Sequence, residues 1–171
     1  MEDKISKGIK SYEERSIESI FLGKVENKVQ HHHRAGHDWE KVIEVFNMPI
    51  NLGDSFNWPY TQSEYLDKLS NSKFGLCMAG YGPKCNREIE LMGLGVVPLI
   101  ADNVCTIYHN PIKEEEHFLR ANNPEEAKEV INNCNKDRWE YISNNVRHWY
   151  EKNCSREGSF RVTQEIVNLE S

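Results

Sequence analysis

The sequence lacks several patterns that would assign it to a common class of protein. Its five cysteines include no CxxC pair, so their spacing indicates neither a disulfide framework nor a zinc-binding knuckle. It contains no uninterrupted apolar run near the roughly twenty residues that a membrane-spanning helix requires. The net charge of -6 argues against a general nucleic-acid binder, because phosphate backbones need clustered Lys and Arg. We therefore expect no membrane span and no nucleic-acid partner.

The start of the chain, MEDKISKGIK, also lacks the apolar core of a signal peptide. An odd number of cysteines with wide, irregular spacing is typical of a reducing compartment rather than of a disulfide-bonded secreted domain. Both features predict a cytoplasmic protein.

Motifs for nucleotide phosphates and for metals are absent or incomplete. No GxxxxGK[ST] sequence is present, and GYGPKC matches GxGxxG only in part because it lacks the third glycine. Neither an NTPase nor a dinucleotide enzyme is therefore indicated. His31, His32, His33 and His37 include a pair with HxxxH spacing, but the pattern has no glutamate base and no third ligand. We expect no bound metal.

The sequence does contain the alternation of strands and helices that is typical of an α/β domain. Its 171 residues fit one domain with a core of its own. Residues 1–16 are charged and patternless and are interpreted as a polar arm or linker, with the domain at 17–171. Apolar runs predict strands at 17–23, 74–77, 96–100 and 117–120 and a short one near 48–52, and three- and four-residue spacings predict helices at 31–46, after Thr61, after Pro83, after Asn123 and at 139–150 and 160–169. The predicted fold is α/β, with a Rossmann-like, mainly parallel sheet, flanking helices and a helical C-terminal tail.

Local signals mark three of the helix ends. Thr61 and Glu64 have the spacing of a capping box. Asn123 and Pro124 combine a capping side chain with proline at the first helical position. Gly95 falls where a left-handed stop is expected.

The chain is organised around residues 73–102, KFGLCMAGYGPKCNREIELMGLGVVPLIAD. Parallel sheets bind ligands at the carboxyl ends of their strands, and the loop after the first strand of this segment carries suitable groups. Gly80 and Gly82 let the backbone approach a ligand, the helix that follows offers free N–H groups, and Lys84 adds a charge. Because one exposed contact with a helix dipole is worth only about 0.3–1 kcal/mol, several must act together. We expect this segment to hold the phosphates and ribose of a nucleotide-activated donor.

Two side chains of the helix share one face. Arg87 and Glu90 are three residues apart and are neighbours, whereas Glu88 is expected to point elsewhere. An arginine can bind a diphosphate through paired hydrogen bonds, and a carboxylate can accept two ribose hydroxyls. The alternative is that Arg87 and Glu90 pair with each other on the surface. Asp102, at the end of the following strand, either contacts the ligand or is an ordinary turn residue.

The loop after the first strand offers two more candidates. Gly23 ends that strand, and Arg34, near the start of the next helix, is either a second phosphate contact or a solvated helix residue. Cys77 and Cys85 have no histidine close in sequence that would activate a nucleophile, so they are interpreted as buried or loop thiols.

Residues 72–102 resemble the signature of exostosin-type glycosyltransferases, in which a strand and a glycine loop precede R-x-x-E and a second strand that ends at an acid. The matching positions are Ser72, Phe74, Leu76, Gly80, Arg87, Glu90, Gly95, Pro98, Ile100 and Asp102. IFLGKVEN with Arg34 is similar to the first strand, loop and helix of that family. The departures are Met78, Leu91 and Val96, where the family usually has Pro, Ala and Cys.

This resemblance implies the carboxy-terminal, donor-binding half of a GT-B enzyme, which has two Rossmann-like domains. Arg87 would then contact the diphosphate and Glu90 the ribose or base of a nucleotide sugar, UDP-linked by analogy, with a glycan as acceptor. It implies no cofactor beyond this substrate and no metal for catalysis. The acceptor-binding half would be supplied by a separate domain or subunit, and no catalytic base is identified.

Two other interpretations remain open from the sequence. The chain could be a non-catalytic nucleotide- or sugar-binding module that keeps the pocket without the partner domain. It could also be an unrelated α/β interaction or signalling domain of flavodoxin-like shape, although the acidic cluster that such receivers carry after the first strand is missing.

Overall fold

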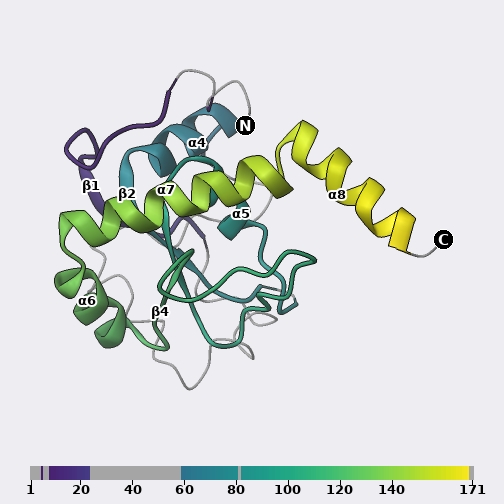
Figure 1. Ribbon diagram of the computed structural model, residues 1–171. Coiled ribbons are helices and arrows are strands. Elements are labelled where there is room, and N and C mark those ends of the chain that lie inside the picture. The colour runs from purple at the N-terminus through teal and green to yellow at the C-terminus, as the bar shows by residue number, and fades with distance from the viewer. Residues whose placement is uncertain (1–4, 6–7, 24–58, 81, 170–171) are drawn as a thin grey trace.

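The computed structural model describes residues 5, 8–23, 59–80 and 82–169, and a four-stranded parallel sheet lies at its centre (Figure 1). Across the sheet the order is β1 (Ile17–Ile20), β2 (Ser72–Cys77), β3 (Val97–Ile100) and β4 (Leu119–Arg120), and every neighbouring pair is parallel. All four strands therefore end at the same edge of the sheet. The predicted α/β class with a Rossmann-like parallel sheet is confirmed.

Five helices are described around this sheet: α4 (Gln62–Ser70), α5 (Arg87–Gly93), α6 (Pro124–Asn133), α7 (Lys136–Asn153) and α8 (Arg156–Leu169). In Figure 1 the long helix α7 crosses in front of the sheet, and α8 extends away from it towards the C-terminus. The two helices predicted at 139–150 and 160–169 are confirmed, although both begin earlier. The helical C-terminal tail is therefore α6, α7 and α8.

The core lies where the strands meet α5 and α7. Phe74 and Leu76 of β2 and Leu99 of β3 are fully buried, as strands covered on both faces require. Gly75 sets how closely α5 approaches β2, because a Cβ at that position would lie 2.4 Å from Leu91 of α5. A larger residue at 75 would push the helix that carries Arg87 and Glu90 off the sheet.

The local signals for helix ends are confirmed. The Thr61 hydroxyl accepts from the backbone N–H of Glu64, whose carboxylate accepts from the Thr61 N–H at 2.8 Å. The Asn123 side chain accepts from the backbone of residue 126, directly before α6. Gly95 has φ +65, the left-handed conformation that was expected.

The helix expected after Pro83 begins later than its sequence suggests. Pro83 is held in a turn, because its carbonyl accepts from the Cys105 N–H at 2.7 Å, and α5 starts only at Arg87. This delay places Arg87 in the first turn of the helix, next to the carboxyl edge of the sheet.

Part of the segment interpreted as a polar arm or linker contacts the domain. Arg15 is 3% exposed, and its guanidinium donates to the carbonyls of Ser70, Ser72 and Leu94 at 2.9–3.1 Å. The Tyr12 ring lies 5.3 Å from the ring of Trp139, edge to face. Residues 8–16 therefore close the amino end of the sheet.

Several predictions fall on residues outside the described part of the chain. These are the helix at 31–46, the short strand near 48–52, Arg34 and the four histidines at 31–33 and 37. Among the residues that are described, no helix has the length and apolar character needed to cross a membrane.

Candidate functional site

The candidate site lies at the carboxyl edge of the sheet, where polar and glycine-rich segments follow the strands. Gly23 follows β1, Gly80 and Gly82 follow β2, and Asp102 follows β3. The sequence prediction that these residues follow parallel strand ends is therefore correct. Because the strands are parallel and adjacent, this edge is where such a fold binds ligands.

Arg87 links the end of β1 to the start of α5. Its Nη2 donates to the carbonyl of Leu22 at 2.5 Å, and the guanidinium carbon lies 4.5 Å from the centre of the Phe21 ring. Gly23 makes this contact possible, because a Cβ there would lie 3.3 Å from Arg87 Nη2 and 2.8 Å from Phe21 Cζ. The structure thus brings together Gly23 and Arg87, two predicted residues that lie far apart in the sequence.

The guanidinium of Arg87 is incompletely satisfied. Its Nε is buried and has no hydrogen-bond partner among the described residues. Burial disfavours the charged guanidinium, but Tyr65 and Cys85 favour it, and the pKa of Arg87 is raised above its usual value. Arg87 therefore stays cationic, and its Nε–H donates to no group among the described residues.

Glu90 is held by a tyrosine from the preceding helix. The Tyr65 hydroxyl donates to Glu90 Oε2 at 2.8 Å. Burial raises the pKa of Tyr65 to about 12, so the phenol keeps its proton and remains a donor at neutral pH. No ion pair joins Arg87 to Glu90 in the described part of the chain, so the alternative of a mutual surface pair is not what the structure contains. Tyr65 instead lies beside both side chains.

Lys84 and Asp102 are engaged with other groups. Lys84 Nζ donates to the carbonyls of Cys105 and Ile107, each at 3.3 Å, and lies 3.2 Å from the centre of the Tyr108 ring. Asp102 accepts from Arg120 Nη1 at 3.1 Å. Lys84 therefore braces the 105–108 loop, and the Asp102 carboxylate is paired at the surface.

The glycine loop leaves its backbone accessible. The Gly80 N–H donates to the carbonyl of Gly82 at 3.2 Å. A Cβ at Gly82 would meet no atom within 4 Å. A ligand can therefore approach the backbone at Gly82 without displacing a neighbour.

Sequence reasoning missed the burial of Glu88. It was expected to point away from Arg87 and Glu90, and it does: it is 0% exposed, and its Oε1 accepts from the Tyr108 hydroxyl at 2.6 Å. Oε2 is also buried and has no hydrogen-bond partner among the residues described. Burial and the neighbouring Glu88 raise the pKa of Tyr108. The partner is distant in sequence, so no local pattern marks this contact.

The structure also brings two cysteines together. All five described cysteines are free thiols, and Cys77, at the end of β2, is buried. The neighbouring Cys77 thiol lowers the pKa of Cys85, whereas burial raises the pKa of Cys77 well above its usual value. The two thiols flank the glycine loop, a proximity that their spacing in sequence did not indicate.

No group of three or more His, Cys, Asp or Glu side chains in the described ranges is arranged to hold a metal ion. The histidines at 31–33 and 37 lie outside those ranges. Comparisons of the chain with protein-family models, with curated proteins and with solved structures find no match. The exostosin-type signature therefore remains a resemblance of residues 72–102, and the geometry of the site is what carries a functional proposal.

Proposed function

We propose that this chain is the donor-binding domain of a glycosyltransferase, which binds a nucleotide sugar, UDP-linked by resemblance, and contributes to sugar transfer onto a glycan. The observation that carries the proposal is the position of Arg87. It is a partly buried cation at the carboxyl edge of a parallel sheet, fixed by the Leu22 carbonyl, with a buried Nε that has no partner among the described residues.

A diphosphate is the group that this arrangement suits best. Arginine presents five N–H donors in a planar fork, and Leu22 accepts from only one nitrogen. Hydrogen bonds between a guanidinium and a phosphate are charge-assisted, and each contributes about 1.5–3 kcal/mol. We assign the backbone N–H of Gly82 as a further donor to this anion, because a Cβ at that position would meet no atom within 4 Å.

Glu90 is suited to the ribose. Tyr65 holds its Oε2, while Oε1 accepts no hydrogen bond from the described residues. A carboxylate oriented in this way can accept from a ribose hydroxyl, and its place three residues after Arg87 puts it on the same face of α5. The phosphate and ribose sites thus come from one turn of one short helix.

The other predicted residues have different parts in this proposal. Gly23 has no Cβ that would crowd the Arg87 guanidinium. Lys84 holds the 105–108 loop through backbone carbonyls and is not assigned to the phosphates. Transfer requires an acceptor site and a base, which we assign to a separate domain or subunit. Five unpaired thiols fit a cytoplasmic setting for such an enzyme.

Calorimetric titration with UDP, GDP and their sugars tests the proposal. We expect one site for UDP, with affinity reduced at least about tenfold in Arg87→Met and in Glu90→Ala. Arg138→Met and Glu129→Ala remove the same charges from a half-buried position on α7 and an exposed one on α6 and serve as matched controls. Absence of nucleotide binding, or equal binding by all variants, contradicts the proposal. Binding without transfer when an acceptor domain is supplied identifies a non-catalytic binding module.

A further inference from the structure

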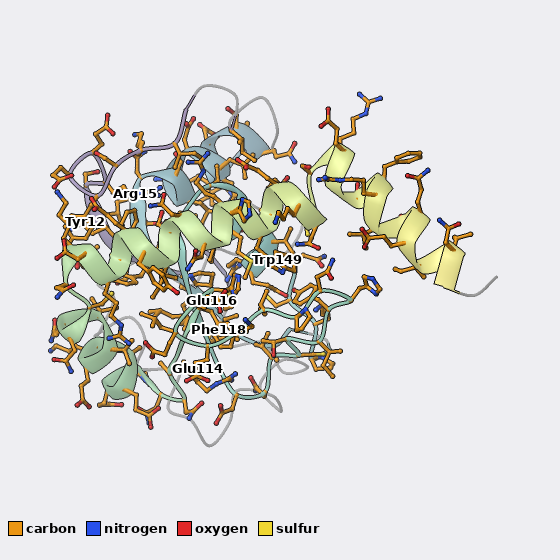
Figure 2. All side chains as sticks on the ribbon, in the orientation of Figure 1. Tyr12, Arg15, Glu114, Glu116, Phe118 and Trp149 are labelled. Carbon is orange, nitrogen blue, oxygen red and sulfur yellow. The ribbon has the colours of Figure 1, made fainter. Side chains whose placement is uncertain are left out.

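A cavity that does not include Arg87 lies beside Trp149. It has a volume of about 550 Å³ and is lined by the second half of α7, by α8 and by the loop at 110–117. Figure 2 labels Trp149 on α7 and Glu116 on the loop, on two of its walls. None of the residues assigned to the nucleotide lines it.

The walls of this cavity hold more positive than negative charge, although the whole chain is acidic. Three cations, Lys113, Lys152 and Arg161, face two carboxylates, Glu116 and Glu165. Glu116 pairs with Lys113 at 3.1 Å. Glu165 lies 3.7 Å from His109 Nε2, which is outside hydrogen-bonding distance, so the cavity holds one carboxylate that is unpaired among the described residues.

Lys152 and Arg161 have no carboxylate partner among the described residues. Lys152 lies in the last turn of α7 and Arg161 lies in α8, so two helices direct positive charge to one cavity. Both residues are exposed and both line the cavity, so an anion can reach their charges from solvent.

His117 adds a neutral donor to the same cavity. It is 8% exposed, burial lowers its pKa, and its Nδ1 accepts from the Lys113 N–H at 3.1 Å. A neutral imidazole that accepts at Nδ1 carries its proton on Nε2. The nearest carboxylate oxygen to Nε2, on Glu116, is 3.8 Å away and outside hydrogen-bonding distance. The Nε2–H therefore remains available to a ligand.

The walls are held in place by contacts that do not use these groups. Trp149 Nε1 donates to the Asn110 carbonyl at 3.1 Å, and Asn110 donates to the Asn153 side chain at 2.7 Å. Gly158 sets the angle between α7 and α8, because a Cβ there would lie 2.5 Å from the Glu151 carbonyl. The cavity is thus preformed around its free cations and its free donor.

We infer that this cavity is a second ligand site, which binds the carboxylate or phosphate group of a small anionic ligand between Lys152, Arg161 and the Nε2–H of His117. It is independent of the nucleotide site, because the two share no residue. A carboxylate and a phosphate offer the same acceptor chemistry, and the experiment separates them.

The test is a ¹H–¹⁵N NMR titration of the full chain with sodium phosphate and, separately, sodium acetate, with sodium chloride used to keep the ionic strength constant. We expect saturable shifts of the Trp149 indole N–H and of amides in 110–117 with at least one of the two anions. Lys152→Gln and Arg161→Gln should each weaken this binding about tenfold. Lys128→Gln removes the same charge from an exposed position on α6 and should change nothing.

Three results would overturn the inference. One is the absence of saturable shifts at these positions with either anion. Another is equal weakening by Lys128→Gln, which indicates non-specific screening. The last is a set of shifts confined to 21–23 and 87–90, which places the anion at Arg87 only. If Arg161→Gln fails to fold, His117→Gln and His117→Ala supply the test, since only the alanine variant lacks a side-chain donor.

Discussion

Two arginines occupy opposite ends of the same sheet, and they differ in how completely the protein satisfies them. At the amino end, Arg15 is 3% exposed and donates to three carbonyls, those of Ser70, Ser72 and Leu94. Its Nε adds a fourth acceptor, the carbonyl of Lys10 at 3.2 Å. At the carboxyl end, Arg87 donates to the Leu22 carbonyl and keeps a buried Nε without a partner among the described residues.

The aromatic surroundings of the two guanidinium groups are similar. Arg15 lies 5.0 Å from the Trp139 ring centre, and Arg87 lies 4.5 Å from that of Phe21. The two arginines differ in exposure, since Arg15 is buried and Arg87 is half-buried, and in hydrogen bonding. A buried arginine whose three nitrogens all donate stabilises the fold, whereas one with a nitrogen that has no acceptor is available for an anionic ligand.

The largest expected effect on stability comes from Arg15, the arginine whose contacts are structural. Arg15→Met keeps the apolar stem but leaves three buried carbonyls without their donor, so we expect the free energy of unfolding to fall by about 3 kcal/mol or more. Urea denaturation measures it. Arg138→Met, which removes only an exposed ion pair with Glu115, should change it by less than about 1 kcal/mol. A loss at Arg15 as small as at Arg138 would show that the carbonyl contacts do not matter.

The next effect tests the other arginine. Arg87→Met removes one carbonyl contact, the contact with Tyr65 and the unsatisfied Nε, so the free energy of unfolding should fall by only about 1–2 kcal/mol while the affinity for UDP falls at least about tenfold. Parallel denaturation and calorimetry separate the two quantities. Loss of stability comparable to that of Arg15→Met, with UDP affinity intact, reverses the roles that we assign.

Alanine substitutions of Gly23 and Gly82 test how much space Arg87 needs at the carboxyl edge of the sheet. Gly23→Ala places a Cβ against Phe21 and Arg87, so we expect a loss of about 1 kcal/mol in stability and a measurably weaker UDP complex, because the guanidinium must move. Gly82→Ala places its Cβ in open space and should cost less than about 0.5 kcal/mol. Thermal unfolding and calorimetry of both variants check this, and equal effects would count against the role of Gly23.

The smallest effect concerns the tyrosine that holds Glu90. The pKa of Tyr65 is raised from 10.0 to about 12 in the folded protein, mainly by burial. The unfolded chain therefore releases this proton first, so the stability that Tyr65 contributes is complete below pH 10 and is lost as pH rises towards 12. Tyr65→Phe should remove about 1–2 kcal/mol of the stability decline between pH 9 and 11.5.

Denaturation of the parent and of Tyr65→Phe across this range measures the difference. The same denaturation series on Tyr108→Phe serves as the comparison, because this variant removes a second phenol whose pKa is raised by burial and by Glu88. Identical pH profiles for the parent and Tyr65→Phe would show that the phenol is not protected at this site.

The features that the sequence predicted well are those that depend on nearby residues. The capping box of Thr61 and Glu64, the cap of α6 at Asn123 and the left-handed Gly95 each require only a few consecutive residues. The strands could also be predicted, because strands buried on both faces have continuous apolar sequences. These local features were enough to predict a parallel α/β fold.

The features that were missed depend on residues far apart in the chain. Arg15 contacts carbonyls 55 to 79 positions away, and Glu88 meets a tyrosine 20 positions away. The spacing of Arg87 and Glu90 identified two residues that the fold gathers at one edge, but it could not show that Tyr65 lies beside both. Lys84 has the charge of a phosphate ligand, yet the carbonyls of the 105–108 loop hold it.

The central claim is that Arg87 binds a diphosphate, and comparing UDP with uridine tests it most directly. Calorimetry gives the ratio of the two affinities, first in the parent chain and then in Arg87→Met, so that any general change in folding or in nucleoside binding cancels. The account predicts a ratio that falls at least about tenfold in the variant, because the diphosphate loses its charge-assisted partner. An unchanged ratio would contradict it, since the diphosphate would then bind without Arg87.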